Sequence, residues 1–229
     1  MQVTPVTARC QEIWRRRPAI VLGISPFNSY FSRSRIEALS RWALTVTGEV
    51  YYFVPDGPSA YTLAATGTPP DRAMKQAAKQ GRYLRNKIRD AHRAAGHAGP
   101  FERHLLDSAR LRSCPAYQRQ HEAITRNYMG RPGFRSACRD ASAWVIGRDV
   151  ADDASVDLAV KYLLAEFPLF LHAEAIIGQP SAAFVYKHCP PVVEETLTGM
   201  PPASRHTAFV RVEPLSSAAR PSVRVRHQP

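Results

Sequence analysis

The chain has 229 residues, and its 31 Lys and Arg outnumber its 19 Asp and Glu, which gives a formal net charge of +12. Its length and its 45% of hydrophobic residues predict a globular protein with one domain. No apolar run approaches the roughly 18 residues that cross a bilayer, which excludes a membrane-spanning protein. The excess of positive charge favours a polyanionic partner, with nucleic acid first and an anionic membrane surface second.

The four cysteines, Cys10, Cys114, Cys138 and Cys189, are far apart and form no Cys-x-x-Cys pair. This spacing is typical of free thiols in a reducing compartment rather than of disulfides or a zinc site. The start of the chain has no continuous apolar core and so does not resemble a secretory signal. We therefore expect a cytoplasmic protein without a bound metal.

The first part of the chain reads as strand, helix and strand. Residues 1–17 are expected to form a flexible basic arm. Residues 18–25 are apolar with little alternation, which is typical of a strand buried in a parallel sheet. Ser34 and Glu37 have the spacing of a capping box at the start of a helix, and residues 49–54 form the next strand. Such a βαβ unit predicts an α/β, Rossmann-like fold with a mainly parallel central sheet flanked by helices.

The first predicted strand leads into the segment GISPFNSYFS. Gly23 allows close approach by backbone or ligand, and Pro26 ends the strand ladder. The hydroxyl of Ser25 is thereby placed at the carboxyl end of a strand, where open α/β sheets bind ligands. A plain loop, in which the serines cap the following helix, is the other interpretation. The residues of this segment alone leave both interpretations open.

Residues 71–95 form the clearest amphipathic helix of the chain. At about 100° per residue, small and apolar side chains fall on one face and cations on the opposite face. Acids are few there, whereas a helix that is merely soluble usually mixes both signs. The helix is therefore a candidate for contact with a phosphate backbone, and a solvated face is the alternative. The cations on or beside the basic face are Lys75, Lys79, Arg82, Arg85, Lys87, Arg89 and Arg93.

Two predicted helices, residues 116–129 and 134–146, precede a third that runs to Pro168. On this third helix Tyr162 and Glu166 are four residues apart and share one face. The helix is apolar nearly all round, so a carboxylate on it carries a large desolvation penalty unless it is paired. We expect a cationic or hydrogen-bonding partner for this glutamate, or a ligand that supplies one.

Two further strands complete the predicted sheet. Residues 181–188 form one of them, with Tyr186 near its end, and residues 207–212 form a last edge strand. Residues 213–229 are rich in Pro, Ser and Arg and are expected to be disordered. The sequence therefore predicts a single catalytic domain over residues 18–212.

Familiar catalytic motifs are absent from the sequence. It contains no Gly-x-Ser-x-Gly elbow, no P-loop, no Gly-x-Gly-x-x-Gly and no His-Glu-x-x-His segment. None of the eight histidines lies in the pattern of a catalytic base. A nucleophilic Ser25 without such a base suits an acyl group that is already activated, such as an ester, better than an amide.

Two segments and one further tyrosine resemble the signatures of cyclodipeptide synthases. GISPFNSYFS resembles the nucleophile motif of that family, with Ser25 as the nucleophile and Asn28 three residues later. YLLAEFPLFL resembles the second signature, in which Tyr162 and Glu166 match the residues that hold the substrate amino group. Tyr186 matches the remaining catalytic tyrosine of the family in its spacing from Tyr162.

The resemblance covers roughly residues 18–212, and Lys187, directly after Tyr186, departs from the family pattern. It implies a Rossmann-like monomer similar to the catalytic domains of class I tyrosyl- and tryptophanyl-tRNA synthetases, without ATP or any other cofactor. It also implies two aminoacyl-tRNAs as substrates, with no membrane and no metal involved. The implied chemistry is ping-pong, through an aminoacyl-Ser25 and a dipeptidyl-enzyme that closes to a diketopiperazine.

The resemblance also implies roles for individual residues. Glu166 would hold the substrate ammonium, and Tyr162 would hydrogen-bond the same amine. Asn28 would steady the backbone carbonyl or the substrate, and Tyr186 would relay a proton in cyclisation. The basic helix falls where the family binds the tRNA acceptor stem. Four residues are candidates by position for contact with the aminoacyl moiety: Gly23, Val21, Phe53 and Leu169.

Two other functions fit parts of the sequence. A non-catalytic RNA-binding module would use the basic helix, while Ser25 merely caps the next helix. A serine esterase of small acyl esters would use Ser25 without tRNA, and its binding would not depend on salt as phosphate contacts do.

Overall fold

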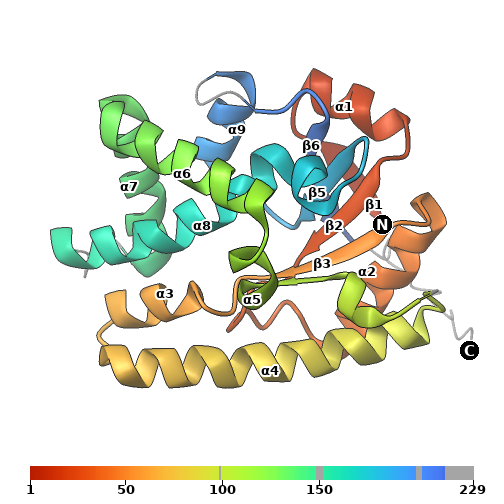
Figure 1. Ribbon diagram of the computed structural model, residues 1–229, viewed down its shortest axis with the longest axis horizontal. Helices are drawn as coiled ribbons and strands as arrows, with labels where there is room; N and C mark the ends of the chain where they lie inside the picture. Colours follow the sequence, from red (N-terminus) through yellow and green to blue (C-terminus); the bar gives the residue numbers. More distant parts are fainter. Residues whose placement is uncertain (98, 148–151, 200–202, 215–229) are drawn as a thin grey trace, which may run out of the picture.

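The computed structural model describes residues 1–97, 99–147, 152–199 and 203–214 of the chain. Its centre is a six-stranded sheet in the order β1-β6-β5-β2-β3-β4 (Figure 1). Neighbouring strands run parallel except β1, which pairs antiparallel with β6. The mainly parallel α/β fold predicted from the sequence is thus confirmed. The strands are β1 (Gln2–Pro5), β2 (Ala19–Gly23), β3 (Val50–Val54), β4 (Leu105–Asp107), β5 (Ala182–Tyr186) and β6 (Thr207–Glu213).

Helices connect the strands and cover both faces of the sheet (Figure 1). They are α1 (Ala8–Arg15), α2 (Arg33–Val46), α3 (Ser59–Ala65), α4 (Pro70–Ala94), α5 (Ser108–Arg112), α6 (Pro115–Gly130), α7 (Pro132–Ile146), α8 (Asp153–Ile177) and α9 (Pro191–Thr198). The crossovers through α2 and α4 move across the sheet in one direction, and those through α5–α8 and α9 move in the other. Because such crossovers are right-handed, the two groups of helices cover opposite faces.

The strand order reverses between β2 and β5. The chain leaves β2 towards β3 on one side and later enters β5 on the other side of β2. In open α/β sheets this reversal opens a crevice at the carboxyl ends of the two central strands, where ligands bind. β2 ends at Gly23 and β5 ends at Tyr186, so the segments after these residues border the crevice.

The core is continuous from the central strands to α8. Both β2 and β3 are buried along their whole length, as expected for parallel strands covered on both faces. The ring of Phe184 packs 4.8 Å from that of Phe170, 5.4 Å from that of Phe209 and 6.0 Å from that of Phe53 between centroids. Such contacts bury large apolar areas. They hold α8 against β5 and β6.

The first 17 residues belong to the fold and do not form the flexible arm that the sequence suggested. β1 pairs along β6, with Gln2 opposite Glu213, and α1 buries Cys10 and Ile13 in the core. β6 is therefore an interior strand, and β1 is the edge. This pairing has almost no sequence signal, because a four-residue strand with every second side chain exposed contains too few apolar residues to be recognised.

Two helix ends differ from their predictions. α8 continues through Pro168 and has non-helical backbone only at His172. The proline removes one helix hydrogen bond, but the surrounding residues are buried and their packing outweighs that loss. α2 is capped by Ser32, whose hydroxyl accepts from the N–H of Arg35, rather than by Ser34.

Within the described ranges, every helix is too short or too polar to cross a lipid bilayer. The predicted disordered tail, residues 213–229, lies outside the described residues except for Glu213, which ends β6, and Pro214.

Candidate active site

Ser25 lies in the loop that follows β2. Ile24 still pairs with β3 by donating its N–H to the carbonyl oxygen of Phe53 at 2.9 Å. Pro26 comes next, and Phe27 then adopts a φ of 59°, a conformation that is unfavourable for a residue with a Cβ. The backbone thus turns sharply after Ser25, and the serine side chain is left at the carboxyl edge of the sheet.

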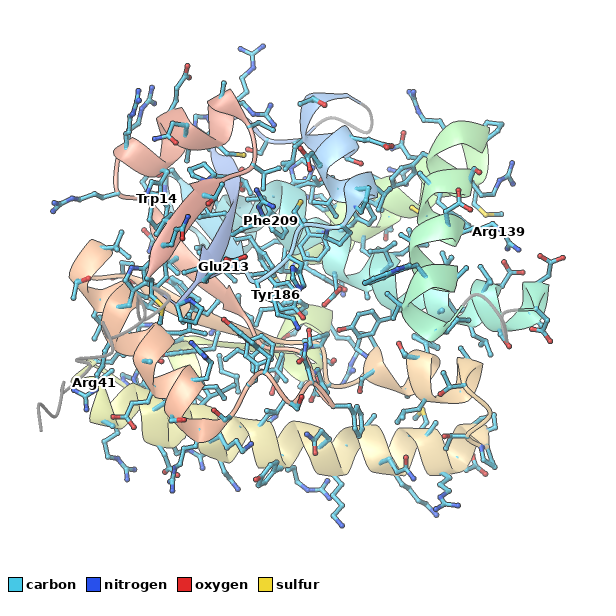
Figure 2. All side chains as sticks on the ribbon, turned by 180° about the vertical axis from the view of Figure 1, so that it is seen from behind. Trp14, Arg41, Arg139, Tyr186, Phe209 and Glu213 are labelled. Carbon is cyan, nitrogen blue, oxygen red and sulfur yellow. The ribbon has the colours of Figure 1, made fainter. Side chains whose placement is uncertain are left out.

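The hydroxyl of Ser25 is hydrogen-bonded to Tyr186, which lies near the middle of the molecule (Figure 2). The distance between the Oγ of Ser25 and the Oη of Tyr186 is 2.8 Å. The Nδ2 of Asn28 donates to the same phenol oxygen at 3.4 Å. Three predicted catalytic residues, from segments far apart in the sequence, are therefore in contact.

The amide of Asn28 has a defined orientation. Its Oδ1 accepts from the backbone N–H of Tyr30 at 3.0 Å, so its Nδ2 faces Tyr186. The phenol oxygen of Tyr186 accepts this hydrogen bond, and in its hydrogen bond with Ser25 either hydroxyl can be the donor. Tyr186 can therefore exchange a proton with Ser25 in either direction.

α8 brings Tyr162 and Glu166 to the same place. Tyr162 lies beside Ser25 and Glu166, and burial raises its pKa well above the ordinary value. Burial also raises the pKa of Tyr186 to about 12, with a smaller contribution in the same direction from Glu166. Both phenols therefore remain protonated at neutral pH and can act as hydrogen-bond donors beside Ser25.

Glu166 is a half-buried carboxyl group that forms no ion pair within the described residues. Burial raises its pKa to about 8, although the hydrogen bond with Tyr162 acts in the opposite direction. In the free protein the group is therefore mostly protonated at pH 7. An ammonium group beside it would stabilise the carboxylate, so the site is electrostatically suited to a primary amine.

The candidate contact residues for the aminoacyl moiety lie in closely packed parts of the structure. A Cβ at Gly23 would stand 2.7 Å from Cζ of Phe184 and 3.1 Å from Cδ2 of Tyr186. The missing side chain of Gly23 thus makes room for these two rings. The other three candidates are closed off from solvent in the core: Val21, Phe53 and Leu169.

Gly23→Ala should therefore damage both packing and activity. The added methyl group collides with the ring of Phe184 and pushes Tyr186 away from Ser25. We expect a loss of about 1–3 kcal/mol in the free energy of unfolding, measured by urea denaturation, together with lower activity. Gly48→Ala is the matched control, because no atom lies within 4 Å of its Cβ position. Equal effects of the two substitutions would contradict this role of Gly23.

α4 runs along one side of the molecule (Figure 1) and carries the cations predicted from the sequence. Its seven predicted cations are not equivalent. The guanidinium of Arg85 pairs with Asp107, and Lys87 and Arg89 are half-buried and lie over neighbouring aromatic rings. The remaining four are exposed to solvent: Lys75, Lys79, Arg82 and Arg93.

Tyr117 and Tyr30 are neighbours of the site that the sequence did not indicate. Tyr117 on α6 donates its hydroxyl to the carbonyl oxygen of Ala165 at 2.9 Å. Burial, together with Glu166, raises its pKa to about 12. Tyr30 contributes its backbone N–H to Asn28. Tyr117 reaches the site only through tertiary packing, and the only available signal for Tyr30 was its place in the GISPFNSYFS segment.

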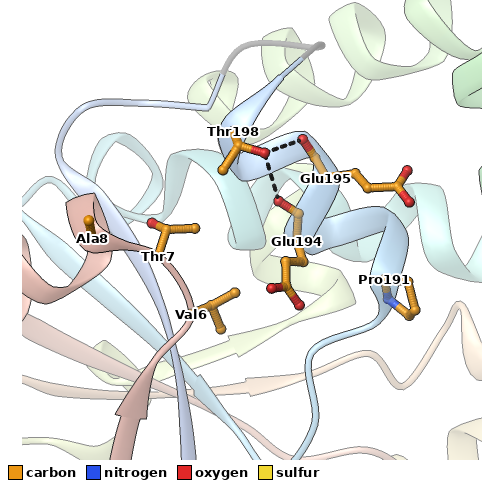
Figure 3. A pocket seen from close by; sticks show the side chains of 7 residues that line it. All are labelled: Val6, Thr7, Ala8, Pro191, Glu194, Glu195 and Thr198. Atoms are coloured by element: carbon orange, nitrogen blue, oxygen red, sulfur yellow. Dashed lines mark hydrogen bonds between the residues drawn. The ribbon is translucent and has the colours of Figure 1, made fainter.

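A hollow of about 560 Å³ lies on the surface between the start of α1 and α9 (Figure 3). Val6 and Thr7 form one wall, and Glu194 and Glu195 lie on the other. β1 runs antiparallel to β6, so the residues after β1 lie near the amino-terminal ends of the parallel strands, opposite the edge that carries Ser25. The hollow therefore contains none of the residues around Ser25.

Comparison with known proteins identifies one family. The family model described as cyclodipeptide synthase matches residues 1–212. The chain is 32% identical over 191 residues to the cyclo(L-leucyl-L-leucyl) synthase of Bacillus subtilis (strain 168), which covers 79% of this chain and 75% of that protein. It is 31% identical over 197 residues to the cyclo(L-tyrosyl-L-tyrosyl) synthase of Mycobacterium tuberculosis (strain CDC 1551 / Oshkosh), with coverage of 84% and 68%.

Solved structures give the same result. The structure of the Mycobacterium tuberculosis protein Rv2275 matches with a TM-score of 0.81 and 29% identity, over 91% of this chain and 90% of that chain. That structure is described as demonstrating that cyclodipeptide synthetases are related to type I tRNA synthetases. A cyclodipeptide synthase from Bacillus thermoamylovorans shares the fold, with a TM-score of 0.86 at 23% identity over 93% and 96%. The chain therefore belongs to the cyclodipeptide synthase family of aminoacyltransferases.

Proposed function

We propose that the protein joins the aminoacyl groups of two charged tRNAs into a cyclic dipeptide by a ping-pong mechanism through an aminoacyl-Ser25. The observation that carries the proposal is the 2.8 Å hydrogen bond between Ser25 and Tyr186, beside Tyr162 and the half-buried carboxyl group of Glu166. A hydroxyl, two phenols and a carboxyl group at one crevice can hold an amino acid by its amine while its ester carbonyl faces the nucleophile.

In the first step, the Oγ of Ser25 attacks the ester carbonyl carbon that joins the amino acid to the terminal ribose of its tRNA. A bond forms between Oγ and that carbon, the bond to the ribose oxygen breaks, and the serine proton passes to the leaving oxygen. Glu166 and Tyr162 hold the ammonium group of the amino acid during this exchange. One ester replaces another, so the step needs no ATP.

In the second step, the amine of the aminoacyl-Ser25 attacks the ester carbon of the second aminoacyl-tRNA. An amide bond forms, the second ribose ester breaks, and the dipeptide remains on the serine. The ammonium must first lose a proton, and Glu166, with a pKa of about 8, is a suitable acceptor. An α-amino group has a pKa of roughly 8, so the transfer between the two groups is almost balanced in free energy. A proton then leaves with the second ribose oxygen.

In the third step, the free amine of the dipeptide attacks the carbonyl carbon of its own ester to Ser25. The second amide bond closes the diketopiperazine ring, and the bond between that carbon and Oγ breaks. Tyr186 is the adjacent donor that returns a proton to Oγ, and it recovers one from the attacking amine. Ser25 is then ready for another turnover.

The exposed cations of α4 support charged tRNA as the source of both aminoacyl groups. A helix of 25 residues is about 37 Å long, enough to follow several phosphates of an acceptor stem. Because charged tRNAs are cytoplasmic, we assign the protein to the cytoplasm. The five proposed catalytic residues belong to one chain, so a monomer can complete the reaction.

The test is to mix the purified protein with tRNAs charged with leucine, tyrosine or phenylalanine, the amino acids in the names of its relatives. Mass spectrometry should detect a cyclic dipeptide and, after an acid quench, an aminoacyl adduct on the peptide that contains Ser25. A protein that binds tRNA but forms neither product is an RNA-binding module. One that hydrolyses small acyl esters without tRNA is an esterase.

Charge reversal on α4 should weaken substrate binding without unfolding the protein. In the variant Lys79→Glu/Arg82→Glu we expect KM for aminoacyl-tRNA to rise by about tenfold or more, with kcat within about twofold, because phosphate contacts contribute binding and not chemistry. Arg15→Glu/Arg16→Glu, at the end of α1 on the far side of the molecule from α4 (Figure 1), is the control with the same change of charge. An unchanged KM in the α4 variant would assign the tRNA contact to another surface.

A further inference from the structure

Lys187, the residue directly after β5, contacts the loop that carries Ser25. Its Nζ lies over the ring of Tyr30, 5.1 Å from the ring centroid. The guanidinium carbon of Arg35 lies over the same ring, also 5.1 Å from the centroid. Tyr30 thus receives one cation from the segment after β5 and one from the start of α2.

Tyr30 connects these cations to the catalytic cluster. Its backbone N–H donates to Oδ1 of Asn28 at 3.0 Å, and Nδ2 of Asn28 donates to Oη of Tyr186 at 3.4 Å. Lys187 follows Tyr186 directly in the sequence. The contacts therefore form a closed circuit from Tyr186 through Lys187, Tyr30 and Asn28 back to the phenol oxygen of Tyr186.

The ring of Tyr30, rather than its hydroxyl, holds this part of the loop. The hydroxyl is buried and has no hydrogen-bond partner within the described residues. The ring meets Phe31 edge to face, with 5.1 Å between centroids, in addition to the two cations. Cation–π contacts strengthen when the groups are partly removed from water, and both Lys187 and Tyr30 are half-buried.

The contact between Lys187 and Tyr30 matters because the backbone of the loop that carries Ser25 is strained. Phe27, between Ser25 and Asn28, has a positive φ, and such strain persists only where surrounding contacts hold it. If Tyr30 were to move, Oδ1 of Asn28 would lose the hydrogen bond that it accepts from the backbone N–H of Tyr30 and that orients the amide. Tyr186 would then lose the donor that holds its phenol oxygen beside Ser25.

We propose that Lys187 is a positioning residue: its ammonium group, by holding the ring of Tyr30, fixes Asn28 and thereby the phenol of Tyr186 against Ser25. The inference rests on the proposed function, since it assigns Lys187 a role in the acylation of Ser25. It differs from a direct contact between Lys187 and a tRNA phosphate, which would act on substrate binding and not on the rate of acylation.

The test compares substitutions that remove the contact with substitutions that keep it. Lys187→Met and Tyr30→Leu remove the charge and the ring, whereas Lys187→Arg and Tyr30→Phe preserve them. The rate of acylation of Ser25 is measured in a single turnover at saturating aminoacyl-tRNA, with KM measured separately. Circular dichroism and thermal melting check the fold, and Lys187→Gln replaces Lys187→Met if the latter melts early.

We expect the two disruptive variants each to acylate about three- to tenfold more slowly, with KM within about twofold of wild type. The conservative variants should stay within about twofold of wild type in both quantities. The double variant Lys187→Met/Tyr30→Leu should be no slower than Tyr30→Leu alone, because both changes break the same contact.

Three results would overturn the proposal: an unchanged acylation rate in Lys187→Met, a higher KM at an unchanged rate, or multiplicative effects in the double variant. The second of these would identify Lys187 as a contact to the substrate. A wild-type protein that forms no aminoacyl-Ser25 at all would refute the proposed function itself, and the role of Lys187 with it.

Discussion

Ser25→Ala should abolish formation of the cyclic dipeptide and of the aminoacyl-enzyme while the protein remains folded. Removal of the attacking oxygen leaves no group that can receive the first aminoacyl moiety, so we expect the yield to fall at least about a thousandfold. The stability change should be small, because one hydrogen bond, that with Tyr186, is lost at a cost of about 1 kcal/mol. Mass spectrometry of product and quenched enzyme measures the first effect, and thermal melting measures the second.

Ser29→Ala is the matched control for this experiment. Ser29 lies in the same loop, is exposed, and is replaced by the same residue. It should leave both the yield and the adduct unchanged. If Ser25→Ala still released cyclic dipeptide at the wild-type rate, the covalent mechanism would be wrong, even though the family assignment would stand.

Glu166→Gln should stabilise the protein at alkaline pH and inactivate it. The pKa of Glu166 in the folded protein is about 8, above the value of roughly 4.3 in an unfolded chain. The folded state therefore binds more protons than the unfolded state between these values, and stability falls as pH rises through the window. Glutamine cannot ionise, so the variant should lose this decline and be more stable at pH 8, by on the order of a few kcal/mol.

The same substitution removes the negative charge that, in the proposed mechanism, holds the substrate ammonium and accepts its proton. We expect kcat/KM to fall by about a hundredfold, as for loss of one partner of a buried charge pair. Urea denaturation at pH 5 and pH 8, together with product assays, measures both effects. Glu195→Gln, which removes an exposed carboxylate from α9, is the control and should alter neither. A variant as active as wild type, or one with the same decline in stability, would contradict this role of Glu166.

The catalytic roles could be predicted because three parts of the chain resemble family signatures, whereas short-range patterns predicted only where some of these residues lie. An unbroken apolar run predicts the strand before Ser25, and a spacing of four places Tyr162 and Glu166 on one face of a helix. Once the sheet is parallel, the carboxyl ends of its central strands meet at one edge. The structure accordingly brings Ser25, Tyr162 and Tyr186 together.

The parts that could not be read depend on contacts between distant segments. The sequence suggested that the missing side chain of Gly23 leaves space for a ligand, but the rings of Phe184 and Tyr186 occupy that space. Arg85 looked like one more cation on the basic face, but it pairs with Asp107. The sequence gives the type and spacing of Gly23 and Arg85. Only the folded structure shows which distant residues lie beside them.

The pairing of β1 with β6 has a practical consequence for anyone who prepares this protein. Gln2 lies opposite Glu213, two residues beyond the level of Tyr186 in the neighbouring strand. Anything fused ahead of Met1 would therefore emerge at the carboxyl edge of the parallel strands, the edge at which the proposed site lies. A purification tag at that end should be cleaved before turnover is measured.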